Sequence, residues 1–358
     1  MEQYWIWLSS VNGIGIKRFY QLLAYFGDAR TIWDNIMDEK PDFLPDKAYA
    51  SLRDARSEAY FYRLFDSLER KEVQCLTGIS DLYPDFLLHT QDAPPVLYVL
   101  GEADFMTERM IGVVGTRRAT RDGLRASYDL SKGLAEHGVA IVSGLARGID
   151  TNAHTGCLDA LGRTIAVLGS GCDVVYPPEN KKLYDRILAN GGTILSEQLP
   201  GSSPLAQHFP ARNRIISALS EGILLVEAGK SSGGLITADY AAEQGKELFV
   251  VPGSIYSASC EGSNALPRDC NAPVLSEWDI LEYYRWEERT AQKKSRTVHE
   301  PLSEEEEKIV DPLRVQEMSF DEIAAATGYD ASRLNTLLTM LELRGIVLRA
   351  PGRMYRLA

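Results

Sequence analysis

Short apolar segments alternate with helical segments through the middle of this 358-residue chain, and this alternation constrains the fold more than any other feature. Six strands are expected, at residues 111–114, 139–143, 164–168, 192–196, 222–226 and 247–251. Helices are expected between them, among them 124–137, 152–161 and 235–244. Strands that alternate with helices build a parallel sheet with helices on both faces. The pattern therefore predicts an α/β domain over residues 81–285.

Residues 1–80 are expected to form a helical domain, with helical character extending to about residue 100 apart from an extended connector at 94–99. The segment Gly13-Ile14-Gly15 precedes an amphipathic stretch, Phe19–Phe26, that ends at Gly27. This order is typical of a SAM-like or helix-hairpin-helix element, in which the amides of the turn meet a DNA phosphate. A tight glycine turn between packed helices is the favoured alternative, because a single hairpin is a weak motif.

The last part of the chain predicts a winged-helix domain over residues 303–358, after a polar linker at 286–302. Its expected helices are 304–313, 320–327 and 331–344, followed by a hairpin of strands 346–350 and 354–357 around Pro351-Gly352. Ser319 and Glu322 form a capping box for the second helix. Asp330 caps the third helix, and Gly345 ends it. Helix, helix, turn, helix and wing is the winged-helix order. The recognition helix offers few basic residues among acidic and apolar ones, so contact with a protein is favoured over contact with DNA.

The composition of the chain excludes several classes of protein. The net charge of -12 argues against a generally basic nucleic-acid binder but leaves room for a local basic pocket. Five scattered cysteines without a Cys-x-x-Cys pair indicate reduced thiols and no zinc site. The chain shows no secretory signal and no apolar run that could span a bilayer. A cytoplasmic protein without a metal or cofactor is therefore expected.

Gly, Ser, Arg, Lys and Asn recur where the predicted strands end, which is the edge where open parallel sheets bind ligands. Small residues there let backbone amides approach an anion, and basic side chains add charge. The candidate phosphate-binding residues lie on five such segments: Gly115, Thr116, Arg117 and Arg118; Ser143, Gly144 and Arg147; Gly169, Ser170, Gly171, Lys181 and Lys182; Arg212, Asn213 and Arg214; and Ser232, Gly233 and Gly234. We place Arg117 at the centre. The number of basic side chains fits a polyphosphate chain better than a small substrate.

Acid–base catalysis would need a committed histidine or carboxylate at the same edge. His154 and Glu227 are the only candidates, and we interpret His154 as a cap or loop-bridging residue and Glu227 as a loop organiser. No enzyme is therefore expected. Tyr176 and Phe209 could stack on bases, although core packing is the favoured role of Phe209.

With these motifs the chain resembles the DNA-processing protein A family (DprA, also called Smf). The matching segments are Gly112–Arg117, Ser143–Asp150, Gly169–Gly171, Tyr176-Pro177, Asn180, Phe209–Ile216, Glu227–Gly233, Val251–Gly253 and Gly262–Asn264. The resemblance implies an extended Rossmann-like fold between a SAM-like and a winged-helix domain, and a homodimer without catalytic activity. It also implies a protein that binds single-stranded DNA, loads the recombinase RecA onto it in natural transformation, and cooperates with single-strand-binding protein. By position, Arg117 and the Lys181–Lys182 region would contact phosphates.

The chain departs from the family at residues 266–271, where Cys270 stands at a position that is usually glycine. This departure puts the loop geometry there in doubt.

Two other functions stay open. A nucleotide-handling enzyme of the phosphoribohydrolase type is suggested by Glu227 near Gly233-Gly234, although its Pro-Gly-Gly-x-Gly-Thr loop is missing. A winged-helix transcription regulator is disfavoured by the acidic recognition helix.

Overall fold

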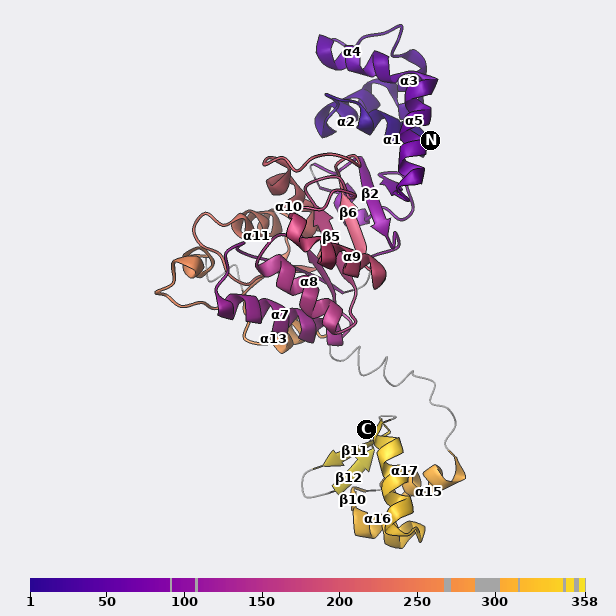
Figure 1. Cartoon of the computed structure of the whole chain (residues 1–358), viewed down its shortest axis with the longest axis vertical. Coiled ribbons are helices and arrows are strands. Elements are labelled where there is room, and N and C mark those ends of the chain that lie inside the picture. Colours follow the sequence, from indigo (N-terminus) through magenta and orange to yellow (C-terminus); the bar gives the residue numbers. More distant parts are fainter. Residues whose placement is uncertain are drawn as a thin grey trace. The chain divides into compact units, whose positions relative to one another are not determined.

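The computed structural model describes residues 1–90, 92–106, 109–266, 272–286, 303–314, 316–343, 346–350 and 354–357. It divides the chain into two compact units, Met1–Glu287 and Glu288–Ala358, and each is described by itself (Figure 1). The polar linker after Trp286, the altered segment 267–271, Arg344-Gly345 and the Pro351-Gly352 turn lie outside the described residues. No helix in the described ranges is long and apolar enough to cross a bilayer.

The chain begins with helices, as expected. These are α1 (Glu2–Ser10), α2 (Ile16–Phe26), α3 (Ala29–Asn35), α4 (Asp46–Ala55) and α5 (Glu58–Arg70). They share an aromatic core that includes Trp5, Trp7 and Phe19, and the Trp7 indole donates to the Ala55 carbonyl at 2.9 Å. Gly13 has a φ of +86° in the turn between α1 and α2, and a Cβ added there would stand 3.5 Å from the Ala48 Cβ. The turn thus packs on α4, as the packing interpretation expects.

Nine strands of the described residues form one sheet in the order β1-β2-β6-β5-β4-β3-β7-β8-β9. They are β1 (Gln74–Thr77), β2 (Val96–Gly101), β3 (Met110–Val114), β4 (Ala140–Ser143), β5 (Thr164–Leu168), β6 (Thr193–Ser196), β7 (Gly222–Leu225), β8 (Glu247–Val250) and β9 (Ala272–Pro273). Strands β3 to β9 pair in parallel, whereas β1 and β2 add an antiparallel edge beside β6. The predicted parallel α/β sheet is confirmed.

The sheet reaches further toward the N-terminus than expected. Helical character to about residue 100 is wrong, because residues 74–101 hold β1 and β2 with only the short α6 (Asp85–Leu88) between them. The connector 94–99 is mostly strand β2, whose first four residues are buried. Strand β1 falls within the 1–80 range expected to be helical, yet it pairs with β2 in the sheet.

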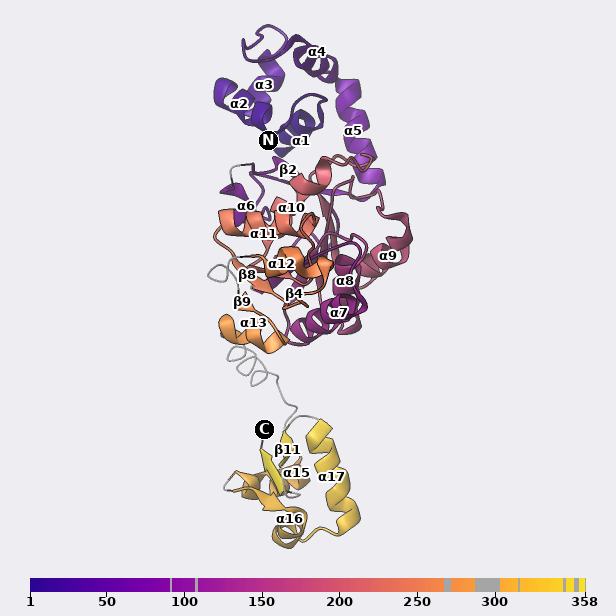
Figure 2. The same cartoon turned by 90° about the vertical axis from the view of Figure 1, so that its left-hand side faces the viewer.

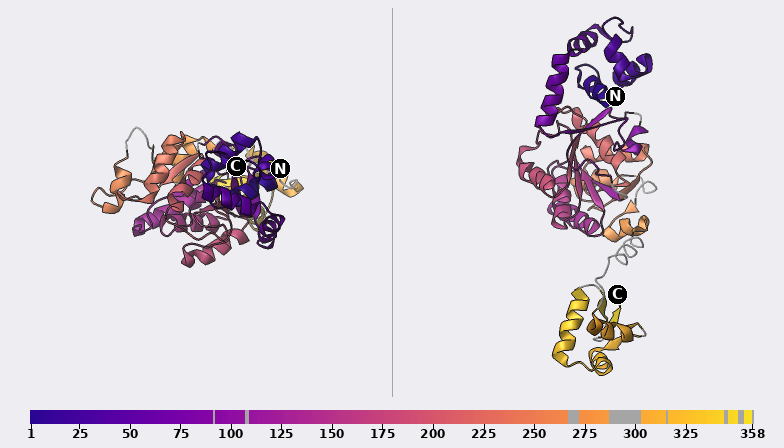
Figure 3. Two further views of the ribbon diagram at one scale, coloured as in Figure 1. Left: turned by 90° about the horizontal axis from the view of Figure 1, so that it is seen from above. Right: turned by 90° about the vertical axis from the view of Figure 1, so that its right-hand side faces the viewer.

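Helices cover both faces of the sheet, as Figures 2 and 3 show from several sides. One face packs against α7 (Arg121–Glu136), α8 (Ile149–Asp159) and α13 (Glu277–Tyr283). The other packs against α10 (His208–Leu219) and α11 (Gly233–Glu243), while α9 (Lys181–Ala189) packs beside β5 and β6. Short helices η1 (Pro178–Asn180), η2 (Ala258–Cys260) and α12 (Glu261–Asn264) occupy the loops.

The second unit has the predicted winged-helix order. Helices α15 (Glu304–Leu313), α16 (Phe320–Thr327) and α17 (Ala331–Leu343) pack beside strands β10 (Met318–Ser319), β11 (Val347–Ala350) and β12 (Met354–Leu357). The three strands form a sheet in the order β10-β12-β11. The Ser319–Glu322 capping box is present, and the Asp330 carboxylate accepts from the first amides of α17. The apolar residues of this unit form a core of their own.

Helices α7 and α8 pack with almost no space between their backbones. A Cβ added to Gly156 would stand 2.3 Å from the Tyr128 carbonyl oxygen, and the Ser127 hydroxyl donates to the Ile149 carbonyl at 2.8 Å. Because the obstructing atoms are backbone, neither helix can yield by rotating a side chain. Glycine at 156 therefore fixes the spacing of the two helices.

Gly156→Ala should destabilise the first unit by roughly 1–3 kcal/mol, because the added methyl group overpacks this contact. The melting temperature should fall by about 2–4 °C per kcal/mol, as measured by thermal unfolding. Gly15→Ala is the matched control, since nothing lies within 4 Å of an added Cβ and the backbone there is extended. Equal melting temperatures for the two variants would contradict the account.

His154 is buried on α8, where its Nδ1 lies 2.7 Å from the Thr164 hydroxyl. Burial, and to a smaller extent the charge of Arg212, lowers the pKa of His154 from 6.5 to about 3. Between these two pH values the unfolded chain binds a proton here that the folded chain does not. The free energy of unfolding therefore falls as the pH drops from 6.5 toward 3.

The variant His154→Gln should lose this pH dependence. Between pH 7 and pH 5 its free energy of unfolding should fall by about 2 kcal/mol less than that of the parent, since one pH unit corresponds to about 1.4 kcal/mol. Urea unfolding at both pH values measures the difference. The exposed His89→Gln serves as the control and should behave like the parent. If the parent and both variants show the same pH dependence of the free energy of unfolding, His154 is protonated in the folded protein as well and its pKa is not lowered.

Candidate nucleic-acid interface

A cavity of about 640 Å³ lies at the carboxyl edge of the parallel strands. Loops after β3 and β4 and the first turns of α10 and α11 surround it. Of the predicted residues, those that line it are Gly115, Thr116, Arg117, Arg118, Arg212, Asn213, Ser232, Gly233 and Gly234. Gly144 and Arg147 line a small adjoining recess together with Arg117, Tyr176 and Phe209. The structure thus gathers the segments that follow β3, β4 and β7 at one site.

The turn after β3 is held in close contact with its neighbours. The Thr116 amide donates to the Glu227 carbonyl at 2.8 Å, which ties the ends of β3 and β7 together. A Cβ added to Gly115 would stand 2.6 Å from Ile149 and 2.9 Å from the Glu227 carbonyl oxygen. Only glycine therefore allows this turn to lie against both elements.

Helix α11 points its first turn into the cavity. Ser232 caps it by accepting from the Gly234 amide at 3.3 Å, and the Asn213 amide group donates to the Gly233 carbonyl at 3.2 Å. The first amides of a helix lack partners within the helix and carry partial positive charge. A small-residue loop that ends in such a helix start is a site where a phosphate oxygen can approach the backbone.

Arg117 and two aromatic rings form another part of the cavity wall. The Arg117 guanidinium lies 5.2 Å from the Phe209 ring centroid, and the Phe209 and Tyr176 rings lie 5.4 Å apart. Phe209 is half-buried and lines the cavity, so the core-packing role favoured for it is wrong. The wall therefore combines one positive charge with aromatic faces, which suits both a phosphate and a base.

Arg212 forms the floor. It is 4% exposed, and its guanidinium donates to the Gly144 carbonyl at 2.7 Å and to the Val167 carbonyl. Burial lowers the pKa of Arg212 to about 10. Burial also raises the pKa of the neighbouring Asp150, while the Arg212 charge lowers it. The Asp150 carboxylate accepts from the Gly144 and Ala146 amides, so this buried pair braces the loop after β4 from below.

The segment 209–216 corrects one expectation, because it is not a loop at a strand end. It lies in α10, whose Ile215, Ile216 and Leu219 face the core. The helix turns Arg212 toward the cavity but Arg214 away from it. Arg214 is buried in an ion pair with Glu197 and lines a different cavity. Its guanidinium is therefore not available to a phosphate, and Arg214 leaves the set of candidates.

The segment 169–171 supports the site from behind. The buried Ser170 donates to the Val174 carbonyl at 2.7 Å, and a Cβ on Gly169 would stand 3.0 Å from the Phe209 ring. Nearby, Asp173 accepts from the Gly201 amide at 2.6 Å and pairs with Lys71 at the end of α5. The buried Ser143 likewise bonds to the Val113 carbonyl. These residues position the cavity wall and do not line it.

Lysine and arginine at the rim are mostly paired with acids. Lys181 pairs with Asp185, and Arg147 pairs with Glu179. Lys182 is exposed on α9. Asn180, part of the family motif, donates to the Leu145 carbonyl at 2.8 Å and so anchors the rim.

Glu227 organises the loop as expected, whereas His154 is structural but neither a cap nor a loop bridge, because it joins the middle of α8 to the start of β5. The buried Glu227 carboxylate accepts from the Thr120 amide and, at 2.6 Å, from the Thr120 hydroxyl. His154 packs beneath β5, away from the cavity. In the described part of the chain, no group of three or more His, Cys, Asp or Glu residues could hold a metal ion. The Thr120–Glu227 contact joins residues 107 positions apart, so no local sequence pattern predicts it.

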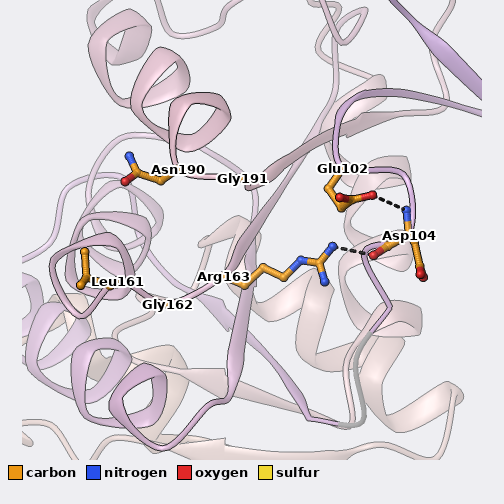
Figure 4. Close-up of a pocket in the computed structure, with 7 residues that line it drawn as sticks. All are labelled: Glu102, Asp104, Leu161, Gly162, Arg163, Asn190 and Gly191. Carbon is orange, nitrogen blue, oxygen red and sulfur yellow. Dashed lines mark hydrogen bonds between the residues drawn. The ribbon is translucent and has the colours of Figure 1, made fainter.

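A second cavity, of about 490 Å³, lies where β5 and β6 begin (Figure 4). Arg163 there donates to the Asp104 carbonyl at 2.5 Å, and the Asp104 amide donates to Glu102 at 3.2 Å. This is the amino edge of the parallel strands, opposite the edge where such sheets bind ligands. Its polar groups largely bond to one another, so we assign the site to the 640 Å³ cavity.

The chain is similar to several known proteins. It is 32% identical to Protein Smf of Synechocystis over 99% of this chain and 98% of that protein, and 40% identical to DNA processing protein DprA of Streptococcus pneumoniae over 63% and 80%. The X-ray structure of the Streptococcus pneumoniae protein matches with a TM-score of 0.67 at 33% identity, covering 79% of this chain and 98% of that one. DNA processing protein A of Helicobacter pylori, whose structure concerns its single-stranded DNA binding mode, matches with a TM-score of 0.54 at 29% identity, covering 60% and 97%.

Two family models match as well. The model for DNA recombination-mediator protein A matches residues 74–285, which hold the whole sheet and the cavity. The model for the DprA winged helix domain matches residues 293–353. The chain therefore belongs to the DprA/Smf family of DNA recombination-mediator proteins.

Proposed function

We propose that the 640 Å³ cavity binds single-stranded DNA. One observation carries the proposal: the turn after β3 and the first turn of α11 converge on a cavity that Arg117, Phe209 and Tyr176 also line. The amide of Gly233, the first residue of α11, can donate to a phosphate, and Arg117 offers charge. The aromatic rings offer a face to a base, which only an unpaired strand can present freely. The binding mode named for the Helicobacter pylori relative supports the same ligand.

The biological role that we infer is that of a recombination mediator. The family resemblance supports loading of RecA onto single-stranded DNA in natural transformation, cooperation with single-strand-binding protein, assembly as a homodimer and action in the cytoplasm. The winged helix is proposed as a protein-contact module, because Arg333 of its recognition helix is already paired with Glu305. No chemical step is proposed, since Glu227 and His154 are both buried in structural contacts.

Arg117→Ala should weaken binding to oligo-dT by about fivefold at 0.1 M salt from counterion release alone, and further where the contact with Phe209 is lost. The slope of log K against log salt should become shallower by about 0.7 for one lost phosphate contact. Fluorescence anisotropy over a range of salt concentrations measures both quantities. Arg117→Lys should recover part of the affinity.

The exposed Arg63→Ala on α5 is the matched control, because it changes the net charge equally at a distance from the cavity. It should bind like the parent. If Arg117→Ala binds with the affinity and salt slope of the parent, the cavity is not the DNA site.

The enzymatic alternative makes an opposite prediction. A phosphoribohydrolase would release the base from a nucleoside monophosphate, and Glu227→Gln would abolish that release. We expect the parent to leave nucleoside monophosphates intact, as followed by chromatography of the bases. Base release that disappears in Glu227→Gln would establish the alternative.

A further inference from the structure

Acidic partners neutralise several of the basic side chains around the cavity. The pairs are Arg147–Glu179, Lys181–Asp185 and Lys230–Glu261. Arg212 lies near Asp150 and bonds to carbonyl groups in the floor. In a chain of net charge -12, a paired cation adds little to the field that a phosphate meets. The unpaired cations therefore indicate where the strand can continue.

Three of the unpaired cations follow one another along the chain. Within the described ranges, no acidic side chain forms an ion pair with Arg117, Arg118 or Arg121. Arg118 lines the cavity, and Arg121 is the first residue of α7. Both side chains are exposed. They extend the positive charge of the cavity onto the outer surface of α7. Lys182, on α9, is likewise unpaired among the described residues.

The position of this helix start is fixed relative to the cavity. Thr120 caps α7, and the buried Glu227 at the end of β7 binds Thr120 through both its amide and its hydroxyl. The inner face of α7 is buried through Ser127 and Leu130, so Arg121 lies on the outer face. One turn further, Arg125 pairs with Asp129 at 3.2 Å. The run of unpaired charge ends at that pair.

We propose that single-stranded DNA leaving the cavity crosses the first turn of α7, where Arg121 contacts a phosphate further along the strand than those held by Arg117 and Arg118. This inference rests on the proposed function and extends it from a pocket to a directed path. Arg121 is then a determinant of how many nucleotides the protein covers. Asp122, exposed in the same turn, is the nearest acidic residue in sequence and should oppose the contact.

The test compares two lengths of oligo-dT, since a strand of about 4 nucleotides can occupy the cavity alone whereas one of about 20 can also reach α7. With the long strand, Arg121→Ala should bind about fivefold more weakly at 0.1 M salt, with a slope shallower by about 0.7. With the short strand it should bind like the parent. Arg121→Lys should restore most of the salt slope, and Arg63→Ala should bind like the parent at both lengths.

Each possible result either supports or overturns the path of the strand over α7. Parent-like binding of the long strand to Arg121→Ala overturns the path over α7, and if Arg117→Ala still binds poorly, the proposed function survives. An equal loss at both lengths places Arg121 inside the cavity and likewise overturns the path. If neither variant loses affinity, the proposed function fails together with the inference. Circular dichroism confirms that each variant is folded.

Discussion

A buried carboxylate joins the two halves of the binding edge. Glu227 lies at the end of β7, and its carboxylate accepts hydrogen bonds from both the amide and the hydroxyl of Thr120, which caps α7. Its own carbonyl accepts the Thr116 amide, so the turn between β3 and α7 is held at both ends by a single residue. A Cβ on Gly123 would stand 2.1 Å from the carboxylate, which shows how tightly the helix start closes over it. The placement of Arg117, between these two anchors, depends on this contact.

The remaining walls are fixed by buried polar groups. Arg212 and Asp150 brace the loop after β4 from within, and Ser170 shapes the turn behind Phe209. Polar groups buried in this way are rigid, because moving any one of them leaves another without a partner in a medium that water does not reach. Few charges then remain for the ligand. The chain has a net charge of -12, yet the cavity keeps local positive charge because Arg117 and Arg118 form no ion pair among the described residues.

The sequence predicted the layers of the fold and the edge where ligands bind, because strand periodicity and glycine at strand ends are local signals. Strands β3 to β8 lie within one or two residues of their expected ranges. It did not predict that β1 and β2 join the sheet, since their pairing depends on partners far along the chain. It also could not distinguish Arg212 from Arg214, which differ only in the direction that α10 gives them. Segment 209–216 was expected to be a loop at a strand end, whereas it lies in α10.

The ion pair between Lys71 and Asp173 connects parts of the chain that the sequence treats as separate. Asp173 also accepts from the Gly201 amide, so the end of α5 and the loop before α10 share one carboxylate. The helical N-terminus is thus connected to the wall of the cavity through Asp173. By thermodynamic linkage, a ligand that orders this wall also lowers the frequency at which α5 detaches from it. A ligand in the cavity should then slow the hydrogen exchange of α5, although the ligand does not contact that helix.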